Sequence, residues 1–198
     1  MGFDANIIVP ALGIFGLLIV VIIYQWIKKQ PGGSGQVEKI GEQIHLGAIT
    51  FMKTEYKMLS GFALVLLILM YIFLGFESAL CFVVGAAASA SAGYIGMNTA
   101  TIANVRTTQA ARTSLPKALK VSFTGGTVMG VGVASLAVLG LGSLFIAFYC
   151  FFGGAEISAN SKEMMRVLEV LAGFSLGAES IALFARVGGG IYTKAADV

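Results

Sequence analysis

The sequence contains few charged residues, few cysteines and a single histidine. Charged residues make up 12% of the chain, whereas about 25% is usual in soluble domains. The two cysteines, Cys81 and Cys150, lack the spacing of a metal site and indicate neither a disulfide framework nor a redox site. The net charge of +3 is dispersed along the chain, so we expect no binding to nucleic acid.

Apolar residues dominate instead, at 57% of the chain with a mean hydropathy of +0.88. They run together in blocks of about 20 residues, the length that a helix needs to cross the hydrocarbon core of a membrane. No basic residue precedes the first block, which disfavours a secretory signal peptide. We therefore predict an all-α fold, a polytopic transmembrane helix bundle that forms a single membrane domain over residues 1–198, with spans near 7–27, 58–75, 79–103, 127–152 and 167–187.

The basic residues predict how these spans are oriented. The segment between the first two spans begins with the turn KKQPGGSG and continues as a polar, helical approach. By the positive-inside rule, the richer side faces the cytoplasm, so the N-terminus lies outside and the chain's last segment lies inside. The inner side would hold Lys28, Lys29, Lys39, Lys53, Lys57, Arg106, Arg112, Lys117 and Lys120, and the outer side only Lys162 and Arg166.

The third and fourth spans are rich in small residues. In lipid, where helices gain nothing from expelling water, glycine and alanine let two backbones approach and gain dispersion contacts. This composition predicts a tight bundle of many helices rather than a single-span anchor. The small residues include Gly85, Ala88, Ser89, Gly93 and Gly96 in the third span and Gly125, Gly126, Gly130 and Gly132 in the fourth.

The fifth span and its exit, EVLAGFSLGAESIALFARVGGGIYTKAADV, carry the ionisable residues. On one continuous helix, Glu179, Arg186 and Asp197 would fall within about 20° of one another, with Lys194 about 60° away. A stripe of charge from mid-membrane to the cytoplasm suits an ion path beneath a polar site. Alternatively, Glu179 pairs with a neighbouring helix while Arg186 extends to the interface.

The segment RVGGGIYTKAAD does not fit a nucleotide-binding P-loop. No glycine precedes Lys194, so the pattern GxxxxGK[ST] is absent, and a strand-to-helix context for GxGxxG is also missing. The triplet at 188–190 more plausibly allows close helix approach. Lys194 could then offer a cation to a phosphate, and Asp197 an oxygen to Mg2+, which prefers carboxylates and phosphates.

Two motifs resemble those of one membrane enzyme family. RVGGGIYTKAADV is similar, almost letter for letter, to the signature of membrane-bound, ion-translocating pyrophosphatases, and GYIGMNTATIANVRTTQAAR resembles the region around their third helix. The resemblance implies an enzyme that hydrolyses pyrophosphate and moves H+ or Na+ out of the cytoplasm. It also implies a homodimer of subunits with about sixteen helices each, in the plasma membrane of a prokaryote or an acidic organelle membrane, with Mg2+ as the cofactor and stimulation by K+ left open.

The resemblance also implies roles for particular residues. Lys194 matches a pyrophosphate-contacting lysine, Asp197 the first catalytic carboxylate and Mg2+ ligand, and Arg186 the arginine of an ion gate below the site. Glu179 is assigned to the gate only because it shares the helical stripe of charge with Arg186, and not from the resemblance. Because hydrolysis with several Mg2+ ions needs multiple carboxylates, we expect residues 1–198 to be an N-terminal portion without activity of its own.

Two other classes of function remain open on composition and topology alone. A secondary transporter or channel could bind a solute through Glu179 and Arg186 without any hydrolysis. A non-catalytic membrane subunit could use its glycine and alanine faces to pack against other proteins. Only the motif resemblance favours the enzyme over these two.

Overall fold

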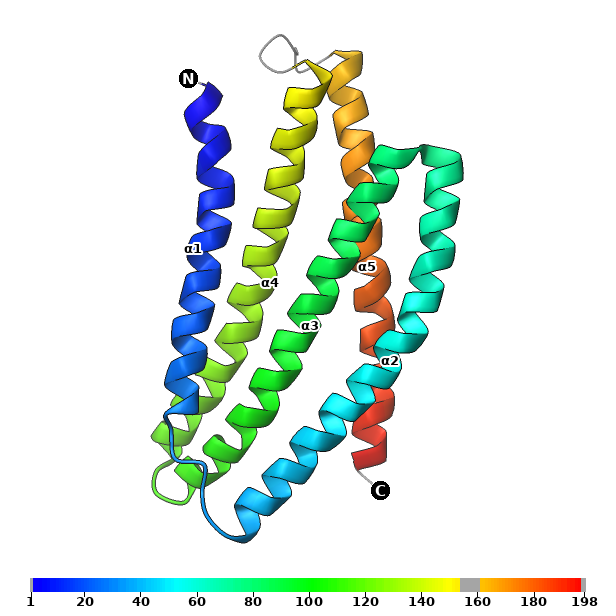
Figure 1. Cartoon of the computed structure of the whole chain (residues 1–198). Coiled ribbons are helices and arrows are strands. Elements are labelled where there is room, and N and C mark those ends of the chain that lie inside the picture. The colour runs from blue at the N-terminus through cyan, green and yellow to red at the C-terminus, as the bar shows by residue number, and fades with distance from the viewer. Residues whose placement is uncertain (1, 154–160, 197–198) are drawn as a thin grey trace.

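The computed structural model describes residues 2–153 and 161–196, and in these residues the only regular structure is α-helix. The predicted all-α membrane bundle is therefore confirmed. All five helices are long and apolar enough to cross a membrane. They are α1 (Gly2–Lys28), α2 (Gln36–Leu74), α3 (Phe76–Ala111), α4 (Leu115–Phe152) and α5 (Lys162–Ala196), as Figure 1 shows.

The helices extend beyond the apolar blocks of the sequence. At 1.5 Å per residue, the 39 residues of α2 reach about 58 Å, roughly twice the thickness of a hydrocarbon core. The polar approach before the second span is thus the first half of α2 and not a separate element. Helix α5 likewise continues through its three glycines to Ala196.

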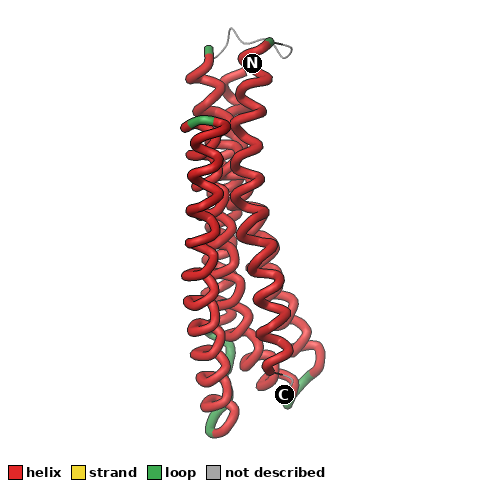
Figure 2. The backbone as a smooth tube through the Cα atoms, turned by 90° about the vertical axis from the view of Figure 1, so that its right-hand side faces the viewer, coloured by secondary structure: helices red, strands yellow, loops and turns green. Residues whose placement is uncertain are grey.

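Helix α3 lies at the centre of the bundle and packs against α2, α4 and α5, while α1 packs mainly along α4. Figure 2 shows that all helices run along one long axis. Three apolar clusters hold them together: one joins α3, α4 and α5 around Phe174, one joins α1, α3 and α4 around Val128, and one joins α2 and α3 around Phe82. The bundle thus has no single core but a series of pairwise contacts.

The closest contact is between α3 and α5, where three glycines bring the two backbones together. A Cβ atom added to Gly85 would overlap the carbonyl oxygen of Phe174, and one added to Gly177 would overlap that of Phe82. Gly173 lies equally close to the Ser78 carbonyl. Gly173 and Gly177 form a small-xxx-small pattern within GFSLG, which permits this approach in lipid. The composition of the third span predicted that Gly85 would allow close packing. The matching roles of Gly173 and Gly177 on α5 were not predicted.

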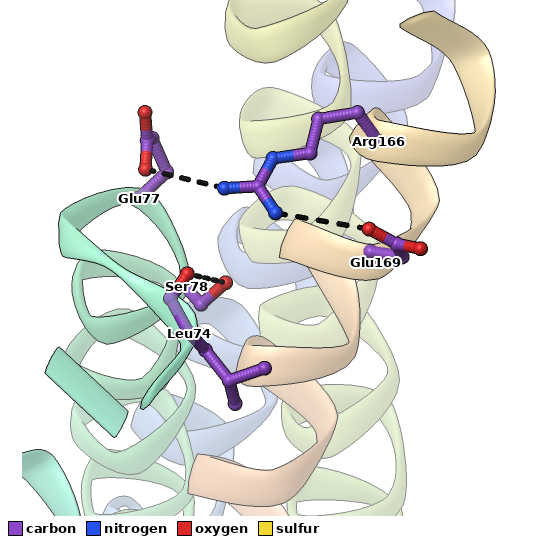
Figure 3. A network of polar contacts seen from close by, with 5 residues as sticks. All are labelled: Leu74, Glu77, Ser78, Arg166 and Glu169. Atoms are coloured by element: carbon purple, nitrogen blue, oxygen red, sulfur yellow. Dashed lines mark hydrogen bonds and ion pairs between the residues drawn. The ribbon is translucent and has the colours of Figure 1, made fainter. Parts of the chain in front are cut away.

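A polar clamp joins α3 and α5 at one end of the bundle (Figure 3). Gly75, with φ +92°, is the only residue between α2 and α3, and its left-handed backbone permits this abrupt turn. Just beyond it, Glu77 lies 3.7 Å from the Arg166 guanidinium, which also lies 3.7 Å from Glu169. The Ser78 hydroxyl donates to the Leu74 carbonyl at 3.5 Å.

Candidate functional site

Helix α5 places Glu179 and Arg186 on the same side, in one cavity of about 600 Å³ between α2, α3, α4 and α5. Seven residues separate them, which is close to two helical turns, so both face the same way. Both side chains are exposed in the described part of the chain. The cavity walls are mainly apolar, with hydroxyls from Tyr56, Ser89 and Ser175.

A second cavity of about 420 Å³ adjoins the first one. The two share lining residues on all four helices: Tyr56, Gly93, Met129 and Ala185. The second cavity lies nearer to the end of α5, because its walls include Gly189, Asn104 at the end of α3 and Ser122 at the start of α4. Together the cavities lead from the middle of the bundle towards the last turn of α5.

Tyr56 stands at the junction of the two cavities. Its hydroxyl donates to the Ala90 carbonyl at 2.7 Å, which ties α2 to α3. The hydroxyl oxygen lies 2.8 Å from the position that a Cβ atom on Gly93 would occupy, so a larger residue there would displace it. Gly93 therefore leaves room for a polar link between α2 and α3, which are also joined by a hydrogen bond between His45 Nδ1 and Thr101 Oγ1 at 2.8 Å.

The predicted site residues further along α5 are only partly described. Lys194 is exposed in the last turn of the helix, and Asp197 lies outside the described residues. Within the described residues, ion pairs form only at Arg166, so Glu179, Arg186 and Lys194 are all unpaired there. The alternative in which Glu179 pairs with a neighbouring helix is not seen in this part of the chain.

The described residues do not by themselves make a magnesium site. Across residues 2–153 and 161–196, no group of three or more His, Cys, Asp or Glu side chains could hold a metal ion. Mg2+ favours sites built from carboxylates, substrate phosphates and water.

Glu55 is a further candidate that the sequence did not reveal. One of its carboxyl oxygens is buried without a hydrogen-bond partner among the described residues, and the side chain lines the second cavity. This oxygen lies against the backbone of Gly188, the first glycine of the triplet. Gly189 and Gly190 have no such neighbour in the described structure, so the close approach predicted for the triplet occurs at one glycine. The one available signal was an acidic residue directly before an apolar span.

Replacing Gly188 by alanine should displace the Glu55 carboxylate, because the added methyl group would overlap it. The carboxylate ends a flexible side chain, so we expect a moderate loss of about 1–2 kcal/mol in unfolding free energy. In a Glu55→Ala background, the same change should cost much less. Thermal unfolding of the four variants measures the coupling, with Gly190→Ala as the matched control. An equal cost in both backgrounds would show that the two residues do not interact.

The chain matches known proteins over nearly all of its length. The family described as inorganic H+ pyrophosphatase matches residues 14–198. A protein of Clostridium tetani is 47% identical over 186 residues, which are 94% of this chain and 25% of that protein. The K(+)-insensitive pyrophosphate-energized proton pump 2 of Moorella thermoacetica is 41% identical over 192 residues, covering 96% of this chain and 27% of the pump.

A third relative is named as a sodium pump. The K(+)-stimulated pyrophosphate-energized sodium pump of Thermotoga maritima is 40% identical over 177 residues, covering 86% of this chain and 24% of the pump. The chain thus spans about a quarter of the length of the curated relatives that it matches. The family match includes all of α2 to α5 and both cavities. The chain belongs to the inorganic H+ pyrophosphatase family.

Proposed function

We propose that the longer protein containing these residues hydrolyses pyrophosphate and uses the free energy to move H+ or Na+ across a membrane. The observation that carries this proposal is the placement of Glu179 and Arg186 in one cavity of an apolar bundle, on the helix whose last turn bears Lys194. Family membership and the names of the relatives support the same reaction. Moving one cation against 100 mV requires about 2.3 kcal/mol, which the hydrolysis of pyrophosphate would supply.

Three residues of α5 would have separate roles in substrate binding and ion transport. Lys194, a compact charge at the exposed end of the helix, would contact a phosphate oxygen of the substrate. Arg186 would repel cations in the cavity, since two like charges about 4 Å apart cost about 4 kcal/mol at an effective dielectric constant of about 20. Glu179, two turns deeper, would provide the opposite charge. A shift of α5 on substrate binding would then change access past Arg186.

The remaining parts of the proposal concern cofactors, assembly and orientation. Asp197 would contribute one carboxylate to a Mg2+ site completed by other segments, and the longer protein would form a homodimer. The N-terminus would lie outside and the end of α5 in the cytoplasm, as the basic residues favour. The relatives are named as K(+)-stimulated and as K(+)-insensitive pumps, so the response to K+ must be measured directly.

Pyrophosphate-driven transport in sealed vesicles tests the proposal. The longer protein is reconstituted, pyrophosphate with Mg2+ is added outside, and phosphate release is recorded together with internal pH and Na+, with and without K+. We expect cation uptake that starts with pyrophosphate and stops when it is consumed. An Arg186→Ala variant should alter the ratio of ions moved to phosphate released, because the charge in the cavity is gone.

Other outcomes would point to the other classes of function. Transport that follows a pre-imposed ion gradient and ignores pyrophosphate would indicate a secondary transporter. Hydrolysis without transport would support the proposed pyrophosphate site but contradict the proposed ion pumping. The absence of both activities would favour a subunit that packs against other proteins.

A further inference from the structure

Another cavity, of about 500 Å³, lies away from the proposed site, where α1 ends, α3 ends and α4 begins. This junction is at the lower left of Figure 1. The walls carry three cationic side chains, Arg106, Lys117 and Lys120, and no acidic residue. The N-terminus of α4 adds partial positive charge, since its first turn has neither an acidic residue nor a side-chain cap. The cavity is therefore suited to an anion.

Two side chains that line this cavity, Arg106 and Gln109, each have a buried polar atom with no hydrogen-bond partner among the described residues. The Arg106 guanidinium donates to the carbonyls of Lys28 and Ile102 at 3.1 Å each, but its Nε is buried without an acceptor among the described residues. Gln109 Oε1 is also buried, and it has no hydrogen-bond donor among the described residues. Such atoms are costly unless another molecule satisfies them.

The chain's only tryptophan, Trp26, lies in the wall of this cavity. Lys120 Nζ lies 5.6 Å from the centre of its ring, a cation–π contact that positions the lysine. Tryptophan is enriched at membrane–water interfaces, because its ring has an apolar body and a polar edge. This preference would place the cavity at the depth of lipid headgroups.

Apolar surface continues from the cavity towards the middle of the bundle. One turn from Trp26 on α1, Ile22 is 66% exposed, and one turn from Lys120 on α4, Phe123 is 71% exposed. A small free anion would leave this surface uncovered, whereas acyl chains would lie on it. The combination of a cationic cavity and an adjoining apolar surface fits an amphipathic ligand.

We propose that this cavity binds the headgroup of an anionic phospholipid, with its phosphate at Arg106, Lys117 and Lys120 and its acyl chains against Ile22 and Phe123. A phosphoglycerol headgroup also offers hydroxyls to the polar side chains that line the cavity, Gln109 among them. Basic pockets between transmembrane helices are known to hold anionic headgroups. The basic residues at this junction then have a binding role in addition to orienting the spans.

Quenching of Trp26 fluorescence tests the site. The purified chain is reconstituted in phosphatidylcholine vesicles that also contain a brominated lipid. This lipid is either phosphatidylglycerol or phosphatidylcholine, brominated in both cases near the top of the acyl chains. We expect brominated phosphatidylglycerol to quench Trp26 at much lower mole fraction than brominated phosphatidylcholine. Lys117→Gln with Lys120→Gln should reduce this preference by roughly fivefold for each lysine, as expected for about 1 kcal/mol per basic residue.

The matched control replaces Lys29 and Lys39 by glutamine, which removes the same charge from exposed positions outside the cavity. The control should keep the wild-type preference, and far-UV circular dichroism verifies that each variant is folded. Equal quenching by the two lipids in the wild-type chain would overturn the proposal. So would protection from quenching by millimolar glycerol phosphate, because it would show a site for free anions rather than for lipid.

Discussion

Gly177→Ala should unfold or strongly destabilise the bundle, although it adds only one methyl group. The new Cβ would overlap the Phe82 carbonyl and lie 3.0 Å from the Ala86 amide nitrogen, and both are backbone atoms of α3. Backbone cannot move aside as a side chain can, so α3 and α5 must separate. We expect a loss of about 3 kcal/mol or more, the upper end for overpacking, against a total stability of about 5–15 kcal/mol.

The matched control is Gly130→Ala, the same chemical change in the middle of another membrane helix. Gly130 on α4 has no described atom within 4 Å of an added Cβ. Alanine is favoured over glycine in a helix by about 1 kcal/mol, so this variant should be neutral or slightly more stable. Thermal unfolding in detergent, followed by circular dichroism and by the monodisperse fraction on size exclusion, gives both values. Similar unfolding midpoints for the two variants would contradict the backbone contact between α3 and α5.

Lys194→Ala in the longer protein should lower the rate of pyrophosphate hydrolysis by about two to three orders of magnitude. Removing one preorganised group that stabilises charge in a transition state typically costs this much. Lys194 is exposed in the last turn of α5 and unpaired among the described residues, so its loss should leave the fold intact. Steady-state phosphate release, resolved into kcat and KM, measures the effect. This expectation rests on the proposed function.

Lys162→Ala provides the control at the other end of the same helix, where the lysine is also exposed. It should leave kcat and KM within about twofold of the wild-type values, since a surface substitution away from the site changes little. A wild-type rate of hydrolysis by the Lys194→Ala variant would show that Lys194 does not act in the substrate site. A rise in KM with unchanged kcat would instead assign it to binding the substrate and transition state equally.

The membrane helices could be predicted from sequence because the bilayer sets a length. Apolar blocks of about 20 residues are a strong signal, and each expected block lies within one helix of the bundle, apart from Gly75 at the end of the second block. The ends of helices are set differently, by backbone hydrogen bonding that does not require apolar residues. This is why α2 begins at Gln36, well before its apolar half, and why α5 continues through three glycines.

The candidate site was predictable where it depended on one helix only. The seven-residue spacing placed Glu179 and Arg186 on one face, and both line the same cavity. Glu55 could not be found in this way, because it becomes notable only when α2 packs against Gly188 of α5. The pattern GFSLG was visible in the sequence, but its partners on α3 are set by tertiary packing. Asp197 stays a prediction from the resemblance.

The glycine contact between α3 and α5 also determines which parts of the bundle can yield. At Gly85, Gly173 and Gly177 the backbones of α3 and α5 are in close contact, and Glu77 and Arg166 tie the two helices at one end, so we expect them to move together. The two cavities lie between α5 and parts of α2, α3 and α4. If the end of α5 that bears Lys194 moves, we therefore expect α3 to move with it and the cavity around Arg186 to change shape.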